Sequence, residues 1–300
     1  MELPSIVTLR SGALKVDVAP SIGGAIAGFW RGGIALMRET PEDALRNGLV
    51  RQTSSYPLIP YSNRIAHGRF SFEGVEHRLA LNFGDHPHSI HGNAWQKPWQ
   101  VAEASETHCR LSFLHRPVGD DARGWPFAYR AEQNFALSPE GLGITLLVEN
   151  LDEDAMPAGL GLHPFFPRRP GVRLKFSAAN VYRTGQDSLP GECVPVPAEW
   201  DYRVIRDLGE PGLDNCFEGW DGDAEILFEQ DKIMLRLEAD PVFGHLVVYV
   251  PTGRDFFAVE PVTHLNDAIN RPDLLGHGLH VLQPREQLSG TVRFVVESTR

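Results

Sequence analysis

A single histidine, His163, stands between small and aromatic residues in the segment AGLGLHPFFPRRP, residues 158–170. An imidazole held in one orientation can act as a general acid or base near neutral pH. Pro164 restricts the backbone of His163 and removes an amide donor. Gly159 and Gly161 carry no Cβ, so a ligand or another backbone segment can approach closely. Taken alone, His163 could equally be a hydrogen-bonded core histidine.

A carboxylate, Glu260, follows four apolar residues in the segment RDFFAVEPVTHLNDAIN, residues 254–270. Burying a carboxylate at the end of an apolar strand is costly unless a partner or a reaction uses it. An apolar setting raises the pKa of a carboxyl group toward the range of a general base. The structural alternative is a glutamate bound to turn amides or to a cation.

The stretch HPHSIHGNAWQKPWQV, residues 86–101, contains His86, His88 and His91 and suggests a zinc site. Strand alternation places the first two histidines on one face and the third on the other, and only Asp85 lies nearby as a further ligand. We therefore expect no metal site. Trp95 could belong to the core or stack on the apolar face of a sugar ring.

Two further segments contain side chains suited to binding hydroxyl groups. In PLIPYSNRIAHGRF, residues 57–70, Asn63 precedes Arg64, whose forked guanidinium can donate to ligand oxygens or form a surface ion pair. In GLDNCFEG, residues 212–219, Asp214 could cap a turn or accept hydrogen bonds from hydroxyls.

The elements that must position these residues are strands. Apolar residues alternate in GLGITLLVEN and TVRFVVES, and RFSFEGVEHRL predicts a hairpin that turns at Glu73-Gly74. Helical periodicity is limited to one short helix in PEDALRNG, with Pro41 in its first turn and Gly48 after its end. Residues 184–222, rich in proline, are expected to form an elaborate loop. The pattern predicts an all-β protein, a large antiparallel β-sandwich forming one domain over residues 1–300.

Composition narrows the classes of partner. The 300 residues have a net charge of −11, which argues against nucleic acid and anionic membranes as main partners because both require a basic surface. Three cysteines without CxxC spacing are expected to be reduced thiols that serve as small core residues. No secretory signal and no run of 18 apolar residues is found, so we expect a cytoplasmic location.

Taken in order along the chain, these segments resemble the aldose 1-epimerase (galactose mutarotase) family. The similarity covers roughly residues 20–297 and includes GWPFAYRAEQNFAL, residues 124–137. Its motifs are Asn63-Arg64-Ile65 with Gly68 and Phe70, His91-Gly92 with Trp95, His163 to Phe166, Leu213-Asp214 with Phe217, and Glu260-Pro261 with Asp267-Ala268 and Asn270.

The resemblance implies a β-sandwich with an open groove for a free monosaccharide. It implies that His163 is the general acid and Glu260 the general base of α and β anomer interconversion, without metal or other cofactor. The residues that it implies for substrate binding are Asn63, Arg64, His91, Trp95 and Asp214.

Departures from the family pattern concern the groups that would form hydrogen bonds with the sugar hydroxyls. Better-studied members have the motifs His-Gly-Gly and His-Pro-Tyr-Phe-Asn, and they have a glutamine in a Gln-Phe-Tyr strand. This chain has Asn93, Phe165 and Pro167 in the first two motifs, and Val247 where the glutamine would align. The galactose or glucose specificity of those members therefore does not transfer.

Three alternative functions remain at this stage. The first is an epimerase of a phosphorylated or acidic sugar, with Arg168 and Arg169 as anion contacts. The second is a non-catalytic sugar-binding or sensing protein, although such a protein needs neither His163 nor Glu260. The third is a metal-dependent isomerase that uses the histidines of residues 86–91.

Overall fold

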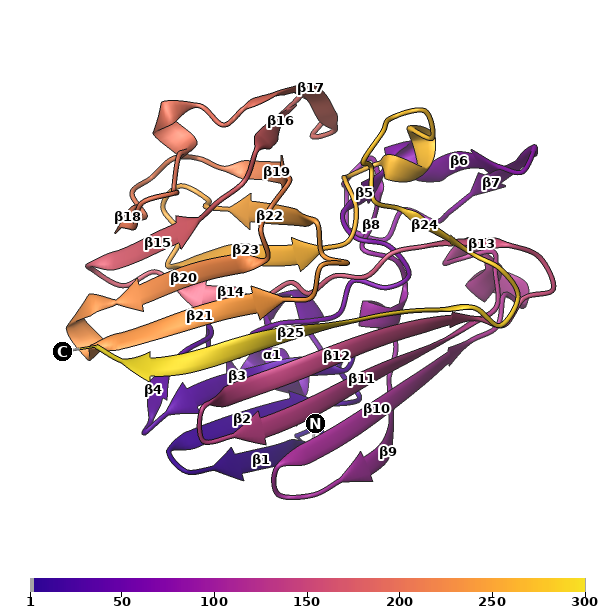
Figure 1. The fold of residues 1–300 in the computed structure, drawn as a ribbon. Helices are drawn as coiled ribbons and strands as arrows, with labels where there is room; N and C mark the ends of the chain where they lie inside the picture. Colours follow the sequence, from indigo (N-terminus) through magenta and orange to yellow (C-terminus); the bar gives the residue numbers. More distant parts are fainter. Residues whose placement is uncertain (1–2, 300) are drawn as a thin grey trace.

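The computed structural model describes residues 3–299, and strands dominate them (Figure 1). The largest sheet has nine strands that pair antiparallel throughout. In spatial order they are β18 (Arg206–Asp207), β15 (Val172–Phe176), β20 (Asp223–Phe228), β21 (Ile233–Ala239), β25 (Gln287–Ser298), β12 (Gly141–Asn150), β11 (Tyr129–Ser138), β10 (His108–His115) and β9 (Gln100–Ala104).

Two smaller sheets lie behind the nine-stranded sheet in the view of Figure 1. The six-stranded sheet has the order β14 (Phe165–Pro167), β23 (Phe256–Val262), β22 (His245–Tyr249), β19 (Asp214–Glu218), β16 (Asn180–Thr184) and β17 (Pro190–Pro195). The four-stranded sheet consists of β1 (Val7–Ser11), β2 (Leu14–Ala19), β3 (Ala25–Arg31) and β4 (Ile34–Ala35).

Short pairs of strands and turns complete the described chain. The pairs are β13 (Met156–Ala158) with β24 (His280–Leu282), β5 (Arg64–Ile65) with β8 (Ser89–Ile90), and β6 (Arg69–Phe72) with β7 (Val75–Arg78). The α-helix is α1 (Glu42–Arg46), and 3₁₀ turns span Val50–Gln52, Ala66–Gly68, Ala94–Gln96, Gly119–Arg123, Ala198–Trp200, Glu229–Asp231 and Ala268–Asn270. No helix within residues 3–299 is long and apolar enough to cross a membrane.

The layers are held together by one apolar core to which all three large sheets contribute. Val16 of β2, Leu146 of β12 and Phe166 of β14 are buried in the same cluster. Alternation along β12 explains its contribution, because every second side chain from Leu142 to Val148 is buried while those between are only half-buried. The predicted sandwich of antiparallel sheets is thus confirmed.

The local predictions were right in two places and wrong in two. The hairpin turns at Glu73-Gly74, both with positive φ, and α1 begins after Pro41 and ends before Gly48. The loop expected over residues 184–222 is wrong, because β17, β18 and β19 lie there. Pro190 and Pro195 stand at the two ends of β17, where proline is tolerated in a strand. Cys193 is exposed, so only Cys109 and Cys216 are core thiols.

Candidate active site

A cavity of about 690 Å³ opens beside the six-stranded sheet. Its walls come from residues 48–52, from the turn at residues 63–64 and from the loop of residues 82–96. The sheet itself contributes five lining residues, namely Phe165, Asp214, Tyr249, Phe256 and Glu260.

The two-residue period of β23 explains how the sheet serves both the core and the cavity. Phe257 and Val259 point into the main core, whereas Phe256 and Glu260 line the cavity and Ala258 packs on the cavity side. The adjacent strands are in register, because Phe165 of β14 and Tyr249 of β22 both stand opposite Ala258. One face of this sheet therefore stabilises the fold while the other builds the site.

His163 is fixed from several sides at the edge of this face. Its backbone amide donates to the carbonyl of Tyr56 at 3.0 Å, and its ring stacks on Phe165 with centroids 4.3 Å apart. The two glycines before it admit protein rather than ligand, since a Cβ on Gly159 would lie 2.1 Å from the ring of His264. Burial, reinforced by the charge of Arg38, lowers the pKa of His163 to about 3, so the imidazole is neutral at physiological pH.

Glu260 faces this ring. Its Oε1 lies 3.4 Å from His163 Nε2, and the residue is only 2% exposed. Burial, and then the charge of Asp214, raises the pKa of Glu260 well above its usual value, while Arg64 acts in the opposite direction. Val247 stands directly opposite Glu260 and supplies no hydrogen bond, and Oε2 has no partner among the described residues. Burial therefore disfavours the charged form of both members of the pair.

His91 is oriented by a reciprocal contact with Asn63. The amide of His91 donates to the carbonyl of Asn63 at 2.8 Å, and the amide of Asn63 donates to His91 Nδ1 at 3.0 Å. Both residues adopt positive φ, which places them on tight turns. Because Nδ1 accepts, the proton of the neutral ring resides on Nε2 and can be donated to a ligand in the cavity.

Arg64 and Asp214 form an ion pair across the cavity. Arg64 Nη2 donates to Asp214 Oδ2 at 3.0 Å, and Nη1 donates to Asn63 Oδ1 at the same distance. These two contacts hold the guanidinium plane against the wall. Asp214, about one-third exposed, keeps a carboxylate edge toward solvent where hydroxyl groups could bind.

Trp95 lines the cavity but is fully engaged with protein. Its Nε1 donates to the carbonyls of Gly92 and Ile90, and its ring stacks on Tyr56 with centroids 5.4 Å apart. The structure therefore brings together all seven residues predicted for the site. Trp95 supports the wall, and Tyr56 lies between it and His163.

Several lining residues were missed by the sequence analysis. Arg38, Arg51, Tyr56 and Phe83 all border the cavity. They come from segments such as ALMRET and TSSYPL, which contain no recognisable chemical motif. Only the proximity created by the fold identifies them.

His88, the middle histidine of residues 86–91, is occupied by backbone contacts. His88 accepts from the amide of His67 at Nδ1 and donates to the carbonyl of Asp187 at Nε2, so neither ring nitrogen is available. Within residues 3–299, no three His, Cys, Asp or Glu side chains come together as metal ligands. The hypothesis of a metal held by all three histidines of residues 86–91 thus loses His88 as a ligand.

The two arginines proposed as anion contacts do not border the cavity. Arg168 donates to the carbonyls of Pro251 and Gly209, and Arg169 is paired with Asp231. That part of the acidic-sugar hypothesis is wrong, because both guanidinium groups connect strands and loops of the protein.

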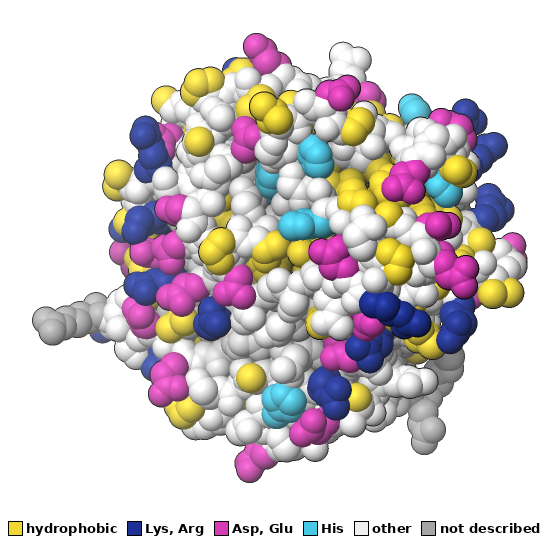
Figure 2. Space-filling view, turned by 45° about the vertical axis from the view of Figure 1, so that its right-hand side comes forward, with side chains coloured by type: hydrophobic (Ala, Val, Ile, Leu, Met, Phe, Trp, Pro, Cys, Tyr) yellow, Lys and Arg dark blue, Asp and Glu magenta, His cyan; other side chains and the backbone are white. Residues whose placement is uncertain are grey.

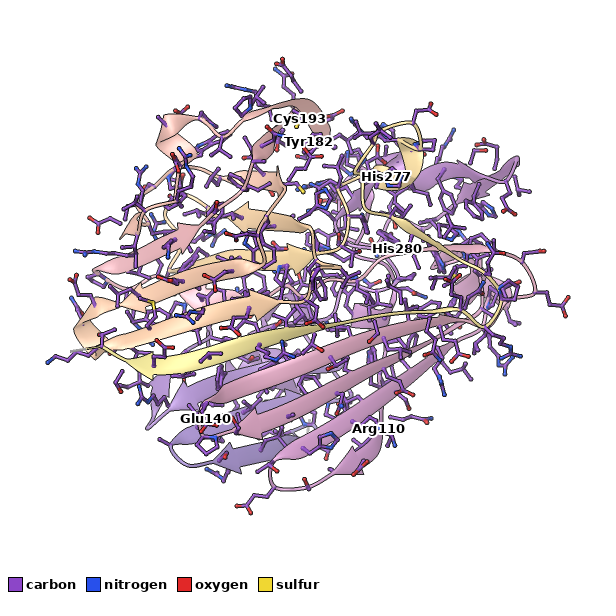
Figure 3. All side chains as sticks on the ribbon, viewed as in Figure 1. Arg110, Glu140, Tyr182, Cys193, His277 and His280 are labelled. Atoms are coloured by element: carbon purple, nitrogen blue, oxygen red, sulfur yellow. The ribbon has the colours of Figure 1, made fainter. Side chains whose placement is uncertain are left out.

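The exposed thiol belongs to a separate cluster at the far end of the six-stranded sheet. Tyr182 and Cys193 lie near each other there (Figure 3), and both donate to the carboxylate of Glu218. Burial and the contact with Glu218 raise the pKa of Cys193, which makes the thiol a weak nucleophile.

The family of this chain follows from its similarity to known proteins. The sequence model of the aldose 1-epimerase family matches residues 5–295. The chain belongs to the aldose 1-epimerase family. It is 32% identical to the uncharacterised protein YphB of Escherichia coli strain K12, over 98% of this chain and 99% of that protein.

Solved structures share the fold of this family member. A crystal structure from Escherichia coli K12 has a TM-score of 0.89 at 31% identity and covers 98% of this chain and 99% of that chain. The galactose 1-epimerase of Lactobacillus acidophilus has a TM-score of 0.77 at 18% identity, with 98% and 94% covered. Membership of the family supports a role as a carbohydrate epimerase.

Proposed function

We propose that the protein interconverts the α and β anomers of an aldose, with His163 and Glu260 as the acid–base pair. The observation that carries the proposal is the 3.4 Å approach of His163 Nε2 to Glu260 Oε1 at the wall of a cavity large enough for a monosaccharide. Within residues 3–299, Glu260 Oε1 has no hydrogen-bond or ion-pair partner other than His163, and both Glu260 Oε2 and His163 Nδ1 have no hydrogen-bond partner, so neither group is used elsewhere in the fold.

The reaction needs one proton removed and one delivered. Glu260 takes the proton from the C1 hydroxyl, the C1–ring oxygen bond breaks, and His163 delivers a proton to the ring oxygen. The C1 carbonyl of the open chain then rotates about the C1–C2 bond. Closure on the opposite face returns both protons by the reverse path and gives the other anomer. Each positioned proton carrier typically contributes about 10²–10⁴-fold to the rate.

His163 and Glu260 together hold one exchangeable proton, which is the number that ring opening and closure require. Ring opening by a carboxylate and an imidazolium leaves a carboxylic acid and a neutral imidazole. Burial favours this second form, because it lowers the pKa of His163 and raises that of Glu260. Both forms contain one proton and have no net charge, so the site can shift between them without exchanging a proton with solvent.

The remaining polar groups would hold the sugar hydroxyls. Arg64 and His91 Nε2 are donors, whereas Asp214 is an acceptor, and all three line the same cavity. The Asn63 contacts fix both donors before substrate arrives, which reduces the entropy lost on binding.

Polarimetry or NMR exchange over a panel of aldoses tests this function. We expect the protein to accelerate anomer equilibration of at least one aldose, with the same rate in the presence of EDTA. A rate lost on chelation and restored by a metal ion would contradict the proposed chemistry. Sugar binding without any acceleration would instead identify a binding protein.

A further inference from the structure

The hydroxyl groups of the tyrosines divide into two sets. The chain has six tyrosines, and four of them lie outside the cavity. Each of these four pairs its hydroxyl with a protein group, namely Tyr61 with Ser89, Tyr129 with Asn93, Tyr182 with Glu218 and Tyr202 with the carbonyl of Leu208. The two that line the cavity, Tyr56 and Tyr249, have no hydrogen-bond partner for the hydroxyl within residues 3–299.

Tyr56 differs from Tyr249 in its burial. Tyr249 is only partly buried, so water can satisfy its hydroxyl, whereas Tyr56 is 2% exposed. A buried tyrosine normally pairs its hydroxyl, because leaving the group unpaired is costly. The Tyr56 oxygen is not sealed in the interior, unlike the unpaired Oε2 of Glu260, so the surface that it retains faces the cavity. The hydroxyl of Tyr56 is therefore available to a molecule that fills the cavity.

The ring of Tyr56 is fixed beside the acid–base pair. It stacks on Trp95 with centroids 5.4 Å apart, and its centroid lies 4.9 Å from that of His163. Its backbone carbonyl accepts from the amide of His163 at 3.0 Å. The charges of Glu260 and Arg38 both act on its phenol. A ring held by these neighbours presents its hydroxyl to the cavity in one orientation, close to the reacting groups.

The Tyr56 hydroxyl is a permanent neutral donor. Burial, and then the charge of Glu260, raises the pKa of Tyr56 well above its usual value, so the phenol keeps its proton at physiological pH. Acidic and basic side chains are mixed over the face shown in Figure 2, so that face has no field of one sign to attract a charged ligand. Selection of a sugar then depends on hydrogen-bonding groups inside the cavity, and this hydroxyl is one of them.

Ring opening changes the charge on two sugar oxygens. The anomeric oxygen gives its proton to Glu260, and the ring oxygen receives the electron pair of the C1–ring oxygen bond as His163 protonates it. Partial negative charge therefore develops on both oxygens, which lie between Glu260 and His163. A hydrogen-bond donor already placed there stabilises the transition state more than it stabilises the bound sugar.

We propose that Tyr56 is a further substrate-contacting residue, whose hydroxyl donates a hydrogen bond to the anomeric or the ring oxygen during ring opening. This inference rests on the proposed function and adds a donor that takes no part in the proton exchange. The ring and the hydroxyl then have separable roles, since the ring supports His163 while the hydroxyl contacts the sugar.

Tyr56→Phe tests the inference, because it keeps the ring against His163 and removes only the hydroxyl. The assay uses the aldose that the wild type converts fastest, with rates corrected for spontaneous exchange. The value of kcat should fall by about tenfold or more, while KM changes by less than about threefold. The Tm should not fall, since the hydroxyl has no protein partner to lose.

Tyr202→Phe is the matched control. Tyr202 is also 2% exposed, but it lies outside the cavity and its hydroxyl donates to the carbonyl of Leu208 at 2.9 Å. This variant should have a lower Tm, because it leaves a buried carbonyl without its donor, and should keep the kcat and KM of the wild type. The two variants should thus show opposite patterns of activity and stability.

The outcomes separate this inference from the proposed function. An unchanged kcat in Tyr56→Phe would overturn the role of the hydroxyl while leaving the mutarotase intact. A rise in KM alone would also overturn it, since the hydroxyl would then bind a sugar oxygen that does not react. A fall in kcat accompanied by a drop in Tm like that of Tyr202→Phe would assign the hydroxyl a structural role instead. No acceleration of any sugar by the wild type would overturn the function on which the inference rests.

Discussion

Replacing Glu260 by glutamine should stabilise the protein while it removes activity. The carboxyl group is buried, Oε2 has no partner, and its pKa is raised well above the usual value because of burial and the charge of Asp214. Between the ordinary glutamate pKa and this raised value, the folded state keeps a proton that the unfolded state releases. Rising pH therefore favours unfolding of the wild type, and this effect is absent below the ordinary pKa.

The amide of Glu260→Gln has the shape of the protonated acid and cannot ionise. Relative to the wild type, the variant should gain stability progressively as pH rises above about 4.5, with no gain at lower pH. The gain near pH 8 should be about 1–3 kcal/mol, the usual cost of burying a polar group with inadequate partners. For 300 residues, this corresponds to a rise in Tm of roughly 2–5 °C. The same variant should lose about 10²-fold or more in kcat.

The measurement is a pair of thermal unfolding series from pH 4 to pH 8. Glu149→Gln is the matched control, because Glu149 is also buried but accepts from Arg130 at 2.7 Å. The Glu149→Gln substitution removes an ion pair, so this variant should show no gain in stability at pH 8. Equal pH dependence of Tm in Glu260→Gln and the wild type would refute the reasoning, since Glu260 would then not be a carboxyl group with a raised pKa.

Four further outcomes are expected. His163→Asn should lower kcat by about 10²-fold, and combining it with Glu260→Gln should be little worse, because both act in one proton exchange; additive losses would indicate independent roles. The plot of kcat/KM against pH should show no decrease around pH 6.5 on the acid side, since burial lowers the pKa of His163 to about 3. The value of kcat/KM should fall at alkaline pH as Glu260 ionises. Asp214→Asn should move that alkaline limb to lower pH in the same profile, because the Asp214 charge raises the pKa of Glu260. Arg64→Ala and His91→Ala should weaken activity with an unchanged circular dichroism spectrum; wild-type rates in both would remove them from the site.

The alternation of apolar and polar residues along the strands made much of the fold predictable. The buried positions of β12 and β25 follow the two-residue period of their sequences, and this period depends only on neighbouring residues. The choice of which strands become neighbours cannot be predicted from adjacent residues, because β12 and β25 are separated by more than a hundred residues. The prolines of residues 184–222 concealed β17, which begins and ends with proline, since proline at a strand end and proline in a loop look alike in sequence.

The candidate site was predictable to a similar extent. The unusual surroundings of His163 and Glu260 marked each of them, but their approach to 3.4 Å is produced by the pairing of β14 with β23. Arg38 and Tyr56 could not be found, because their importance comes from what lies next to them in space. Arg168 and Arg169 were given a role from sequence proximity to His163, and the fold directs them elsewhere.

The position of β25 has a consequence for the order in which the chain can fold during synthesis. This strand separates β12 from β21 in the nine-stranded sheet, as the yellow ribbon in Figure 1 shows. Until residues 287–298 leave the ribosome, the strands before residue 151 and those after residue 171 form two sheet halves, each with an open edge. Such edges invite pairing between chains, and non-local pairing of this kind folds slowly. A nascent chain thus contains His163, Glu260 and every strand of the six-stranded sheet before the nine-stranded sheet is continuous, and the full sandwich can close only after residues 287–298 have been translated.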